Sequence, residues 1–231
     1  RLIHRHRDGE ATIDGNLDDY AFLVLGLTEL YEATFKTKYL EEALRLQHKM
    51  IKHFWDRESG GLFFTSDYSE KILARYKDFR DGAIPSGNSI AFLNLVRLAR
   101  MTGKSQYEEK AAALAKAFAS HEEGTPSQNA MFLAGLDFSI GPAYEIVIVG
   151  DPKSKETEKM LHAIRTKFIP SKVVLFKREN GTSLENVASF TKDMKTIAGE
   201  TTAYICRNFV CSKPMTDTRK VLKILTHSSN R

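Results

Sequence analysis

The 231-residue chain has little of the residues that mark several classes of protein. Its two cysteines are too few for a disulfide framework, which favours a reducing compartment and a cytoplasmic location. Two cysteines without a nearby histidine are also too few for a structural zinc site, so neither a metal nor a cofactor is expected. The longest apolar run, Ala21 to Leu27, is far shorter than the roughly 20 residues that a membrane-spanning helix needs.

The charge of the chain argues against a nucleic-acid-binding protein. The net charge of +5 is small for this length, and the basic residues are scattered, without a cluster that includes exposed aromatic residues. Neither a nucleic acid nor a membrane is therefore an expected partner. A hydrophobic content of 42% and a charged content of 27% are ordinary for a globular protein that buries a substantial core.

The first part of the chain has the periodicity of paired helices. Residues 17–34 are apolar on nearly all faces, as in a buried helix, whereas residues 38–55 carry one apolar stripe and one charged face. The same order returns at 88–101 and 106–119, and a further buried helix is predicted at about 128–138. A repeat of about 70 residues indicates an array of helical hairpins.

After Gly141-Pro142 the pattern changes to an alternation of strands and helices. A strand, a helix of a dozen residues and a second strand predict a βαβ unit with parallel strands. We therefore expect an α/α-hairpin segment over 1–141 and a small parallel-sheet α/β subdomain over 142–231. The predicted elements are strands at 144–150, 172–176 and 202–206, and helices at 154–168 and 216–225.

Polar residues that suit helix caps open the buried helices. Asp18 and Asp19 lie at the start of the first, and the motif Pro-Ser-x-Asn places Ser86 and Asn88 at the start of the next and recurs at 126–129. Free N–H groups and the positive end of the helix dipole make such positions suitable for carboxylates and polar ligand atoms. The same residue types are the preferred N-caps, so capping alone is the competing interpretation.

The connection between the first two hairpins carries two further signals. Residues 60–65, Gly-Gly-Leu-Phe-Phe-Thr, predict a short strand or ribbon, and residues 77–81 are dense in charge. Glycoside hydrolysis needs two carboxyls roughly 5–9.5 Å apart. Because neighbours in sequence point to different faces, one of Asp18 and Asp19 would pair with Asp81, and a salt bridge of Asp81 to a nearby cation is the alternative.

Four motifs, taken in order, suggest a family, and those at 81–89 and 203–214 are long enough to be specific. The sequence has Asp-Asp-Tyr-Ala-Phe at 18–22, Leu-Tyr-Glu-Ala-Thr at 30–34, Asp-Gly-Ala-Ile-Pro-Ser-Gly-Asn-Ser at 81–89 and Ala-Tyr-Ile-Cys-x-x-x-x-Cys-x-x-Pro at 203–214. It resembles the C-terminal part of the YyaL-like family, which includes the spermatogenesis-associated thioredoxin-domain proteins of animals. The resemblance covers essentially the whole chain.

The resemblance implies an architecture more than an activity. It implies an N-terminal thioredoxin-like domain, then a six-hairpin, glycosidase-like (α/α) toroid, then a small α/β tail. A closed toroid needs more helices than this chain has, and the chain opens on Arg1 rather than Met, so we expect a fragment. The missing hairpins and the thioredoxin-like domain are its expected partners.

The favoured function is a glycosidase-like domain that binds or processes carbohydrate. A hydrolase fits better than a sugar epimerase, which would need a pair of histidines, because His48 and His53 lie on the outer helix. The alternative is a non-enzymatic protein-interaction module coupled to the thioredoxin-like domain. The expected catalytic residues are Asp18, Asp19 and Asp81, and the expected substrate-binding residues are Tyr20, Lys77, Ser86 and Asn88.

The two cysteines are candidates for a separate redox role. Cys206 ends a predicted strand, and Cys211 precedes Pro214 and a predicted helix, where a lowered pKa makes a cysteine reactive. The four intervening residues allow a disulfide but do not form the Cys-x-x-Cys of thioredoxins. Buried structural cysteines are the favoured interpretation, and the implied thioredoxin-like domain strengthens the redox alternative.

Overall fold

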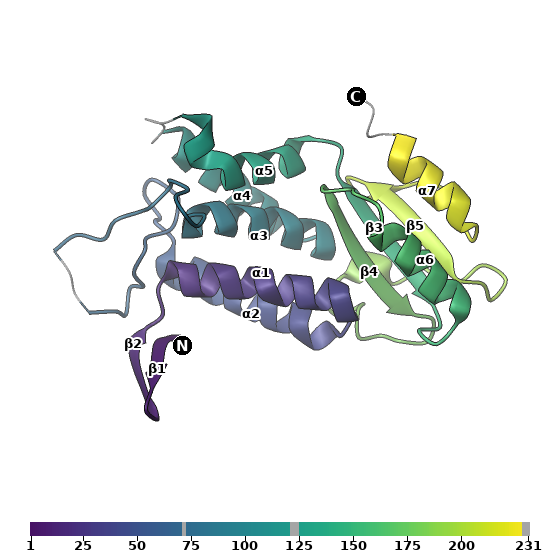
Figure 1. Cartoon of the computed structure of the whole chain (residues 1–231), viewed down its shortest axis with the longest axis horizontal. Coiled ribbons are helices and arrows are strands. Elements are labelled where there is room, and N and C mark those ends of the chain that lie inside the picture. Colours follow the sequence, from purple (N-terminus) through teal and green to yellow (C-terminus); the bar gives the residue numbers. More distant parts are fainter. Residues whose placement is uncertain (71–72, 121–124, 228–231) are drawn as a thin grey trace. The chain divides into compact units, whose positions relative to one another are not determined.

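The computed structural model describes residues 1–70, 73–120 and 125–227 (Figure 1). The chain divides into two compact units, of which the first comprises residues 1–98 and 105–136 and the second residues 99–104 and 137–231. The first unit is built mainly of helices, and the second combines a small sheet with helices. The expected boundary at 141–142 lies a few residues beyond the start of the second unit's main segment.

The first unit opens on a β-hairpin that the sequence analysis did not predict. Strands β1 (Ile3–Arg7) and β2 (Glu10–Asp14) pair antiparallel around a two-residue turn. The turn residues Asp8 and Gly9 have φ values of 52° and 83°, the left-handed region that a tight hairpin turn requires. Asp-Gly between two short polar strands is the sequence signal for this hairpin.

All helices predicted for the first part of the chain are confirmed to within a few residues. Tyr20, Ala21, Val24 and Tyr31 of the first helix are at most 1% exposed, which agrees with its apolar sequence. The helices are α1 (Leu17–Thr34), α2 (Thr37–Phe54), α3 (Gly87–Thr102), α4 (Ser105–Ala119) and α5 (Ala130–Ile140), the last preceded by the 3-10 turn η1 (Pro126–Asn129).

The apolar helices α1, α3 and α5 are neighbours in the first unit (Figure 1). Asn94 of α3 donates its side-chain N–H to the carbonyl of Ala21 in α1 at 2.8 Å, and Gly135 of α5 lies against Phe92 of α3. The outer helix α4 packs onto α5 through the stacked rings of Phe118 and Phe132, whose centroids are 3.9 Å apart. The hairpin order is therefore present, while closure into a toroid stays a prediction.

Residues 60–65, predicted as a short strand or ribbon, form no regular strand. An isolated bridge between Trp55 and Leu62 takes its place. Both backbone groups of Leu62 are bound by the side chain of Asn88, which accepts from Leu62 N–H at 2.8 Å and donates to Leu62 C=O at 2.9 Å. A side chain therefore provides the pairing that a neighbouring strand would have supplied.

The second unit contains a mixed sheet in the order β4-β3-β5-β6. Strands β3 and β4 are parallel with α6 between them, as predicted, but β5 runs antiparallel to β3, so the prediction of a parallel sheet is wrong for this strand. The described segment between β4 and β5 contains no α-helix of the kind that usually forms a parallel crossover. The elements are β3 (Tyr144–Gly150), α6 (Lys155–Arg165), β4 (Lys172–Arg178), the 3-10 turn η2 (Ser189–Thr191), β5 (Thr202–Arg207), β6 (Val210–Cys211) and α7 (Thr218–His227).

The two cysteines form a disulfide across the hairpin of β5 and β6. Cys206 is fully buried, but Cys211 is exposed, so the interpretation of both as buried structural cysteines is wrong for Cys211. The reason is its position in a two-residue strand at the edge of the sheet, which no further strand covers in the described structure.

Candidate functional site

The candidate site lies where α1 and α3 begin, and Asp18 is its central residue. A Cβ atom at position 87 would lie 2.4 Å from Asp18 Oδ1, so only glycine at this position lets the two helix ends meet around the carboxyl. Burial raises the pKa of Asp18 above its usual value, and the charges of Asp78 and then Asp19 raise it further. The N–H of Gly87, which donates to the carboxylate, opposes this rise.

Asp78 is the residue that the sequence analysis missed. It lies in the charge-dense segment 77–81, is exposed, and acts on the pKa of Asp18 more strongly than Asp19 does. Its backbone C=O accepts from Asn88 Nδ2 at 2.8 Å, which fixes this part of the loop to the start of α3. The only sequence signal for Asp78 was its position in a charged loop, and Asp81 lies in the same loop, so the sequence did not distinguish the two residues.

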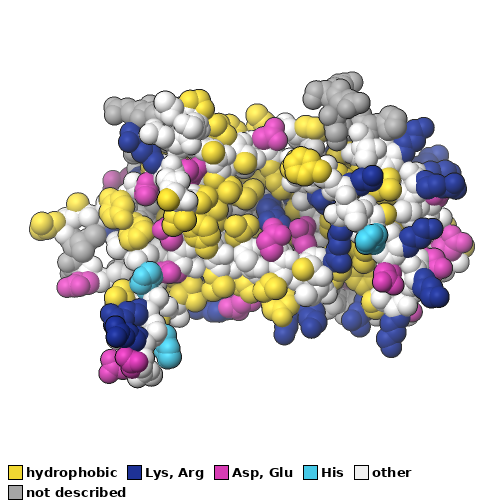
Figure 2. All heavy atoms as spheres, viewed as in Figure 1, with side chains coloured by type: hydrophobic (Ala, Val, Ile, Leu, Met, Phe, Trp, Pro, Cys, Tyr) yellow, Lys and Arg dark blue, Asp and Glu magenta, His cyan; other side chains and the backbone are white. Residues whose placement is uncertain are grey.

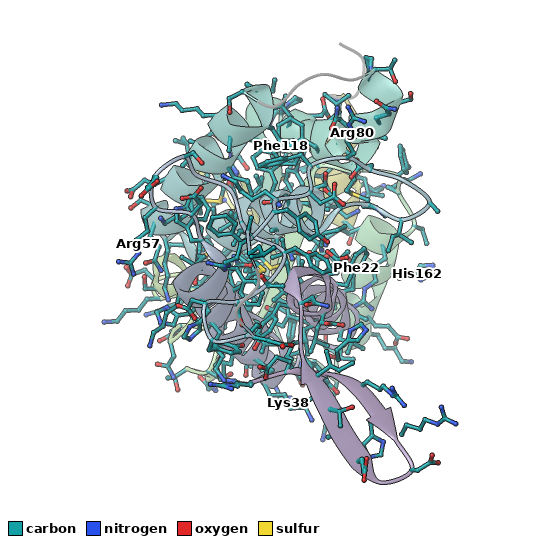
Figure 3. All side chains as sticks on the ribbon, turned by 90° about the vertical axis from the view of Figure 1, so that its left-hand side faces the viewer. Phe22, Lys38, Arg57, Arg80, Phe118 and His162 are labelled. Carbon is teal, nitrogen blue, oxygen red and sulfur yellow. A yellow bond between two sulfur atoms is a disulfide. The ribbon has the colours of Figure 1, made fainter. Side chains whose placement is uncertain are left out.

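An aromatic pair lies beside these carboxyls. Leu17 N–H donates to Phe64 C=O at 2.9 Å and Phe64 N–H donates to Tyr76 C=O at 2.8 Å, so backbone bonds link the start of α1 to Tyr76. The rings of Phe64 and Tyr76 are stacked with centroids 5.1 Å apart, and Tyr76 is 53% exposed. Burial and the charges of Asp78 and Asp18 raise the pKa of Tyr76. Figure 3 views the first unit from this end, with Arg80 labelled on the loop.

Asp19 is bound by its own helix end. Its Oδ2 accepts from Asn16 N–H at 2.8 Å as part of a capping box, and the carboxylate contacts His4 Nδ1 at 2.9 Å. Asp18 and Asp19 therefore differ in environment, as neighbours on a helix must. Asp19 caps the start of α1, while Asp18 points to the start of α3.

Asp81 also accepts hydrogen bonds from two helix beginnings. Its Oδ1 accepts from Ser86 N–H at 3.0 Å, and its Oδ2 accepts from Met131 N–H at 2.7 Å at the start of α5. The Asp81 N–H donates to Gln128 C=O at 2.7 Å. These bonds give Asp81 a structural task, the joining of the loop to α3 and α5, and its predicted pairing with Asp18 or Asp19 is not among its contacts in the described residues.

Lys77 is held inside the loop. Its ammonium donates to Asp56 Oδ2 at 2.7 Å, to Ser59 Oγ at 2.6 Å and to Gly60 C=O at 2.8 Å. The side chains of Lys77 and Asp56 are only 10% and 13% exposed. All three N–H donors of Lys77 are therefore engaged within the loop.

Ser86, Asn88 and Tyr20 are likewise placed by the fold. Ser86 is the residue before α3, and its Oγ accepts from Ser89 N–H at 3.1 Å, as an N-cap does. Asn88 is fully buried and bonded to Leu62 and Asp78. The hydroxyl of Tyr20 accepts from Leu2 N–H at 3.0 Å and bonds Tyr68 at 2.9 Å.

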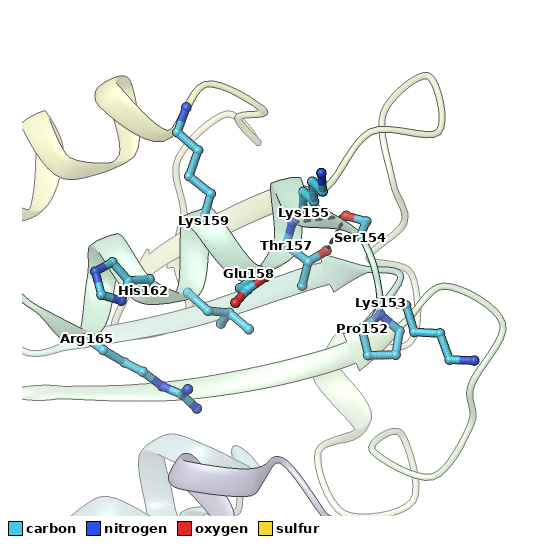
Figure 4. A pocket seen from close by; sticks show the side chains of 10 residues that line it. Pro152, Lys153, Ser154, Lys155, Thr157, Glu158, Lys159, His162 and Arg165 are labelled. Atoms are coloured by element: carbon cyan, nitrogen blue, oxygen red, sulfur yellow. Dashed lines mark hydrogen bonds between the residues drawn. The ribbon is translucent and has the colours of Figure 1, made fainter.

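Asp18 is not among the lining residues of either of two cavities in the described structure. One, of about 770 Å³, follows the start and outer face of α6 from Pro152 to Arg165 (Figure 4). Its lining comes from one helix and the turn before it, in which Ser154 Oγ accepts from Thr157 N–H at 3.0 Å as the N-cap. The other, of about 450 Å³, is lined in part by Trp55 and Lys110. Lys110 Nζ lies over the Trp55 ring, 4.1 Å from its centroid, in a cation–π contact.

The chemistry available at the site is that of carboxyls and an exposed aromatic ring. Within residues 1–70, 73–120 and 125–227, no group of three or more His, Cys, Asp or Glu could hold a metal ion. The helices of this same part of the chain include none with the length and hydropathy of a membrane span. Asp18 can hold a proton at higher pH than an ordinary aspartate, and Tyr76 offers a flat face beside it.

Comparison with known proteins gives three informative relatives. The chain is 35% identical to spermatogenesis-associated protein 20 of Homo sapiens over 213 residues, and 36% identical to that of Rattus norvegicus over the same length. An uncharacterised protein of Caenorhabditis elegans is 30% identical over 210 residues. These alignments cover 90–91% of this chain but only 27–28% of each relative. No family model matches the chain.

Proposed function

The chain belongs to the family of spermatogenesis-associated protein 20, and on that premise we propose that it is part of a glycosidase-like toroid that binds carbohydrate where α1 and α3 begin. The chain spans about a quarter of the length of its relatives, 27–28%. The remaining hairpins of the toroid, and a thioredoxin-like domain, are proposed to come from the rest of the longer protein. The proposed reaction is of the glycoside hydrolase or sugar epimerase type.

The observation that carries this proposal is the environment of Asp18. A general acid must stay protonated near the working pH, and enzymes achieve this for a carboxyl by burial and by a second carboxylate nearby. Both causes act on Asp18, in that order, and its pKa is raised. We assign it the role of proton donor to the leaving oxygen of a sugar.

The second carboxyl of the proposed site is Asp78. Asp19 and Asp81 use their oxygens in helix capping, whereas Asp78 is exposed and near enough to raise the pKa of Asp18. Tyr76 supplies a flat, half-exposed aromatic surface of the kind on which the apolar face of a sugar packs. Because these carboxyls are negative when ionised, the site favours neutral and amino sugars over sugar acids and sugar phosphates.

A second candidate is the protein-interaction module. Leu23 and Leu30 of α1 are 42% and 45% exposed, and Leu133 of α5 is 38% exposed. Figure 2 displays hydrophobic side chains spread over the part of the first unit that α1, α3 and α5 form. An apolar helix face of this kind favours contact with another protein segment. The proposed partner is the part of the longer protein that corresponds to the rest of its relatives' length.

A thermal-shift titration tests the carbohydrate site. Neutral sugars, amino sugars, sugar acids and sugar phosphates are added to the chain, to Asp18→Asn and Asp78→Asn, and to Asp193→Asn as a control on an exposed carboxylate outside the site. A neutral or amino sugar should raise the melting temperature of the chain and of the Asp193 variant but of neither site variant.

Two results oppose the proposal in different ways. An equal rise in all four proteins would place sugar binding elsewhere on the chain. The absence of a rise with every sugar class would remove the carbohydrate function and leave the interaction module as the better assignment.

A further inference from the structure

The disulfide of the second unit joins one buried and one exposed residue. Cys206 of β5 and Cys211 of β6 are paired in register, and Cys206 is fully buried whereas Cys211 is exposed. An incoming thiol can therefore reach the bond from the side of Cys211. The residues between them, 207–210, comprise the last residue of β5, two turn residues and the first residue of β6, and we name this segment the disulfide turn.

The disulfide turn has a left-handed backbone at two residues, a conformation that asparagine adopts readily and phenylalanine does not. Asn208 and Phe209 have φ values of 50° and 61°, and neither is glycine. Such a conformation is uncommon for a bulky residue and persists where the surroundings hold it. The covalent bond between Cys206 and Cys211 closes the ends of this turn.

The surroundings that hold the turn include a buried ion pair. Glu145 of β3 is fully buried, and its Oε1 accepts from Arg100 Nη1 at 3.1 Å. The turn supplies each member of the pair with one more partner. Phe209 N–H donates to Glu145 Oε2 at 3.1 Å, and Asn208 Oδ1 accepts from Arg100 Nη1 at 2.7 Å.

The aromatic side chain of the turn is also packed. The rings of Phe209 and Phe190 meet edge to face with centroids 5.3 Å apart. Opening the turn would therefore expose more of a half-buried aromatic ring and remove one hydrogen-bond partner from each of two buried charges, Arg100 and Glu145. A buried charge that loses a partner weakens the fold around it.

We propose that this disulfide is a thiol-exchange site, reduced by a dithiol, and that its reduction opens the disulfide turn and loosens the Arg100–Glu145 pair. This proposal is independent of the carbohydrate site. It concerns an activity of the second unit that uses a different part of the chain and a different chemistry.

The exchange proceeds in two steps. A thiolate of the dithiol attacks Cys211 Sγ, a new bond forms between these two sulfurs, the Cys206–Cys211 bond breaks, and its electron pair leaves on Cys206 Sγ, which takes up a proton. The second thiol of the dithiol, as its thiolate, attacks the first sulfur of the dithiol in the mixed disulfide. Cys211 leaves and is protonated, and the dithiol departs as a disulfide. The dithiol has lost two electrons and two protons, and the protein has gained them.

Thiol trapping and hydrogen exchange test the proposal with dithiothreitol as the dithiol. The native chain is treated with dithiothreitol, alkylated and analysed by mass spectrometry, and both cysteines should become labelled without denaturant. Treatment with the monothiol glutathione, followed by rapid alkylation, should give the mixed disulfide on Cys211 and the alkyl group on Cys206.

Amide exchange then reports the turn. Reduction should raise the exchange rate of the Phe209 amide at least about tenfold, because the hydrogen bond to Glu145 opens, while the amides in the middle of β3 stay protected. The variant with both Cys206→Ser and Cys211→Ser should show the fast Phe209 exchange with or without dithiothreitol. Should this variant fail to fold, the comparison of the oxidised and reduced native chain still decides.

Several outcomes overturn the proposal. A disulfide that dithiothreitol reduces only in denaturant is not an exchange site. Glutathione found on Cys206 contradicts the assigned point of attack. A Phe209 amide that exchanges equally in both redox states contradicts the opening of the turn.

Discussion

The substitution Asn88→Ala tests whether Asn88 stabilises the fold or binds a ligand. Asn88 was expected to bind substrate, yet its side chain is fully buried and makes three hydrogen bonds. It accepts from Leu62 N–H and donates to the carbonyls of Leu62 and Asp78. Both amide N–H donors are used, so nothing remains for a sugar to accept.

The size of the effect follows from the groups that the substitution leaves unpaired. Leu62 is fully buried, and its N–H and C=O would both lose their partner. Each buried unpaired backbone group costs about 1–3 kcal/mol, so the free energy of unfolding should fall by about 3 kcal/mol. For a chain of this length that corresponds to a fall in melting temperature of about 6–12 °C.

Urea unfolding followed by circular dichroism measures this change. Asn180→Ala is the matched control, because Asn180 is an exposed residue and its loss should change stability by less than about 0.5 kcal/mol. A loss below about 1 kcal/mol in Asn88→Ala would refute the reasoning, since it would mean that water or a backbone shift replaces the side chain at no cost.

Two further predictions concern charges at the same end of the first unit. Lys77→Met should cost about 3 kcal/mol at pH 7, because Asp56 loses its partner in a nearly buried pair. Burial alone would raise the pKa of Asp56, but hydrogen bonds from Lys77 and Ser59 hold it well below its usual value, so the cost in urea unfolding should be smaller at pH 3 than at pH 7. Asp18→Asn should instead raise the free energy of unfolding. The pKa of Asp18 is raised in the folded chain, so its ionised form disfavours folding. The parent chain therefore loses stability as the pH rises through the folded pKa. The variant should match the parent chain below pH 3.8 and exceed it at pH 7, and equal stability at both pH values would contradict the burial of this carboxyl.

Helices were predictable because their signal is repeated many times along each element. Residues 17–34 and 88–101 contain eleven and nine apolar side chains, and α1 and α3 begin and end within a residue of the predicted bounds. The β1–β2 hairpin depends on two turn residues, Asp8 and Gly9, between strands that are almost wholly exposed, so no hydrophobic pattern marked it. The direction of β5 depends on the path of the connection between residues 178 and 202. Because this segment has no periodic pattern, the sequence does not show whether it crosses over the sheet.

The candidate site was harder to predict than the fold, because capping and catalysis use the same residue types at the same positions. Sequence placed Asp18, Asp19 and Asp81 as equals. The structure distinguishes them by their donors: Asp19 receives an N–H from the start of its own helix, and Asp81 receives two from other helix ends. The oxygens of Asp19 and Asp81 are thus engaged by backbone N–H groups at helix beginnings, which is the task of a cap.

Asp18 differs because the opposing effects are stronger than its single backbone donor. Burial and two neighbouring carboxylates outweigh the N–H of Gly87, and the result is a carboxyl whose neutral form is favoured. The close approach that creates this environment depends on glycine at position 87, where a Cβ would meet Asp18 Oδ1 at 2.4 Å. Gly87→Ala would therefore push Asp18 from its place without touching a titratable group. The glycine in Pro-Ser-Gly-Asn, rather than the polar residues around it, distinguishes this helix beginning from the Pro-Ser-Gln-Asn of η1, where glutamine takes that position and forms a capping box with Thr125.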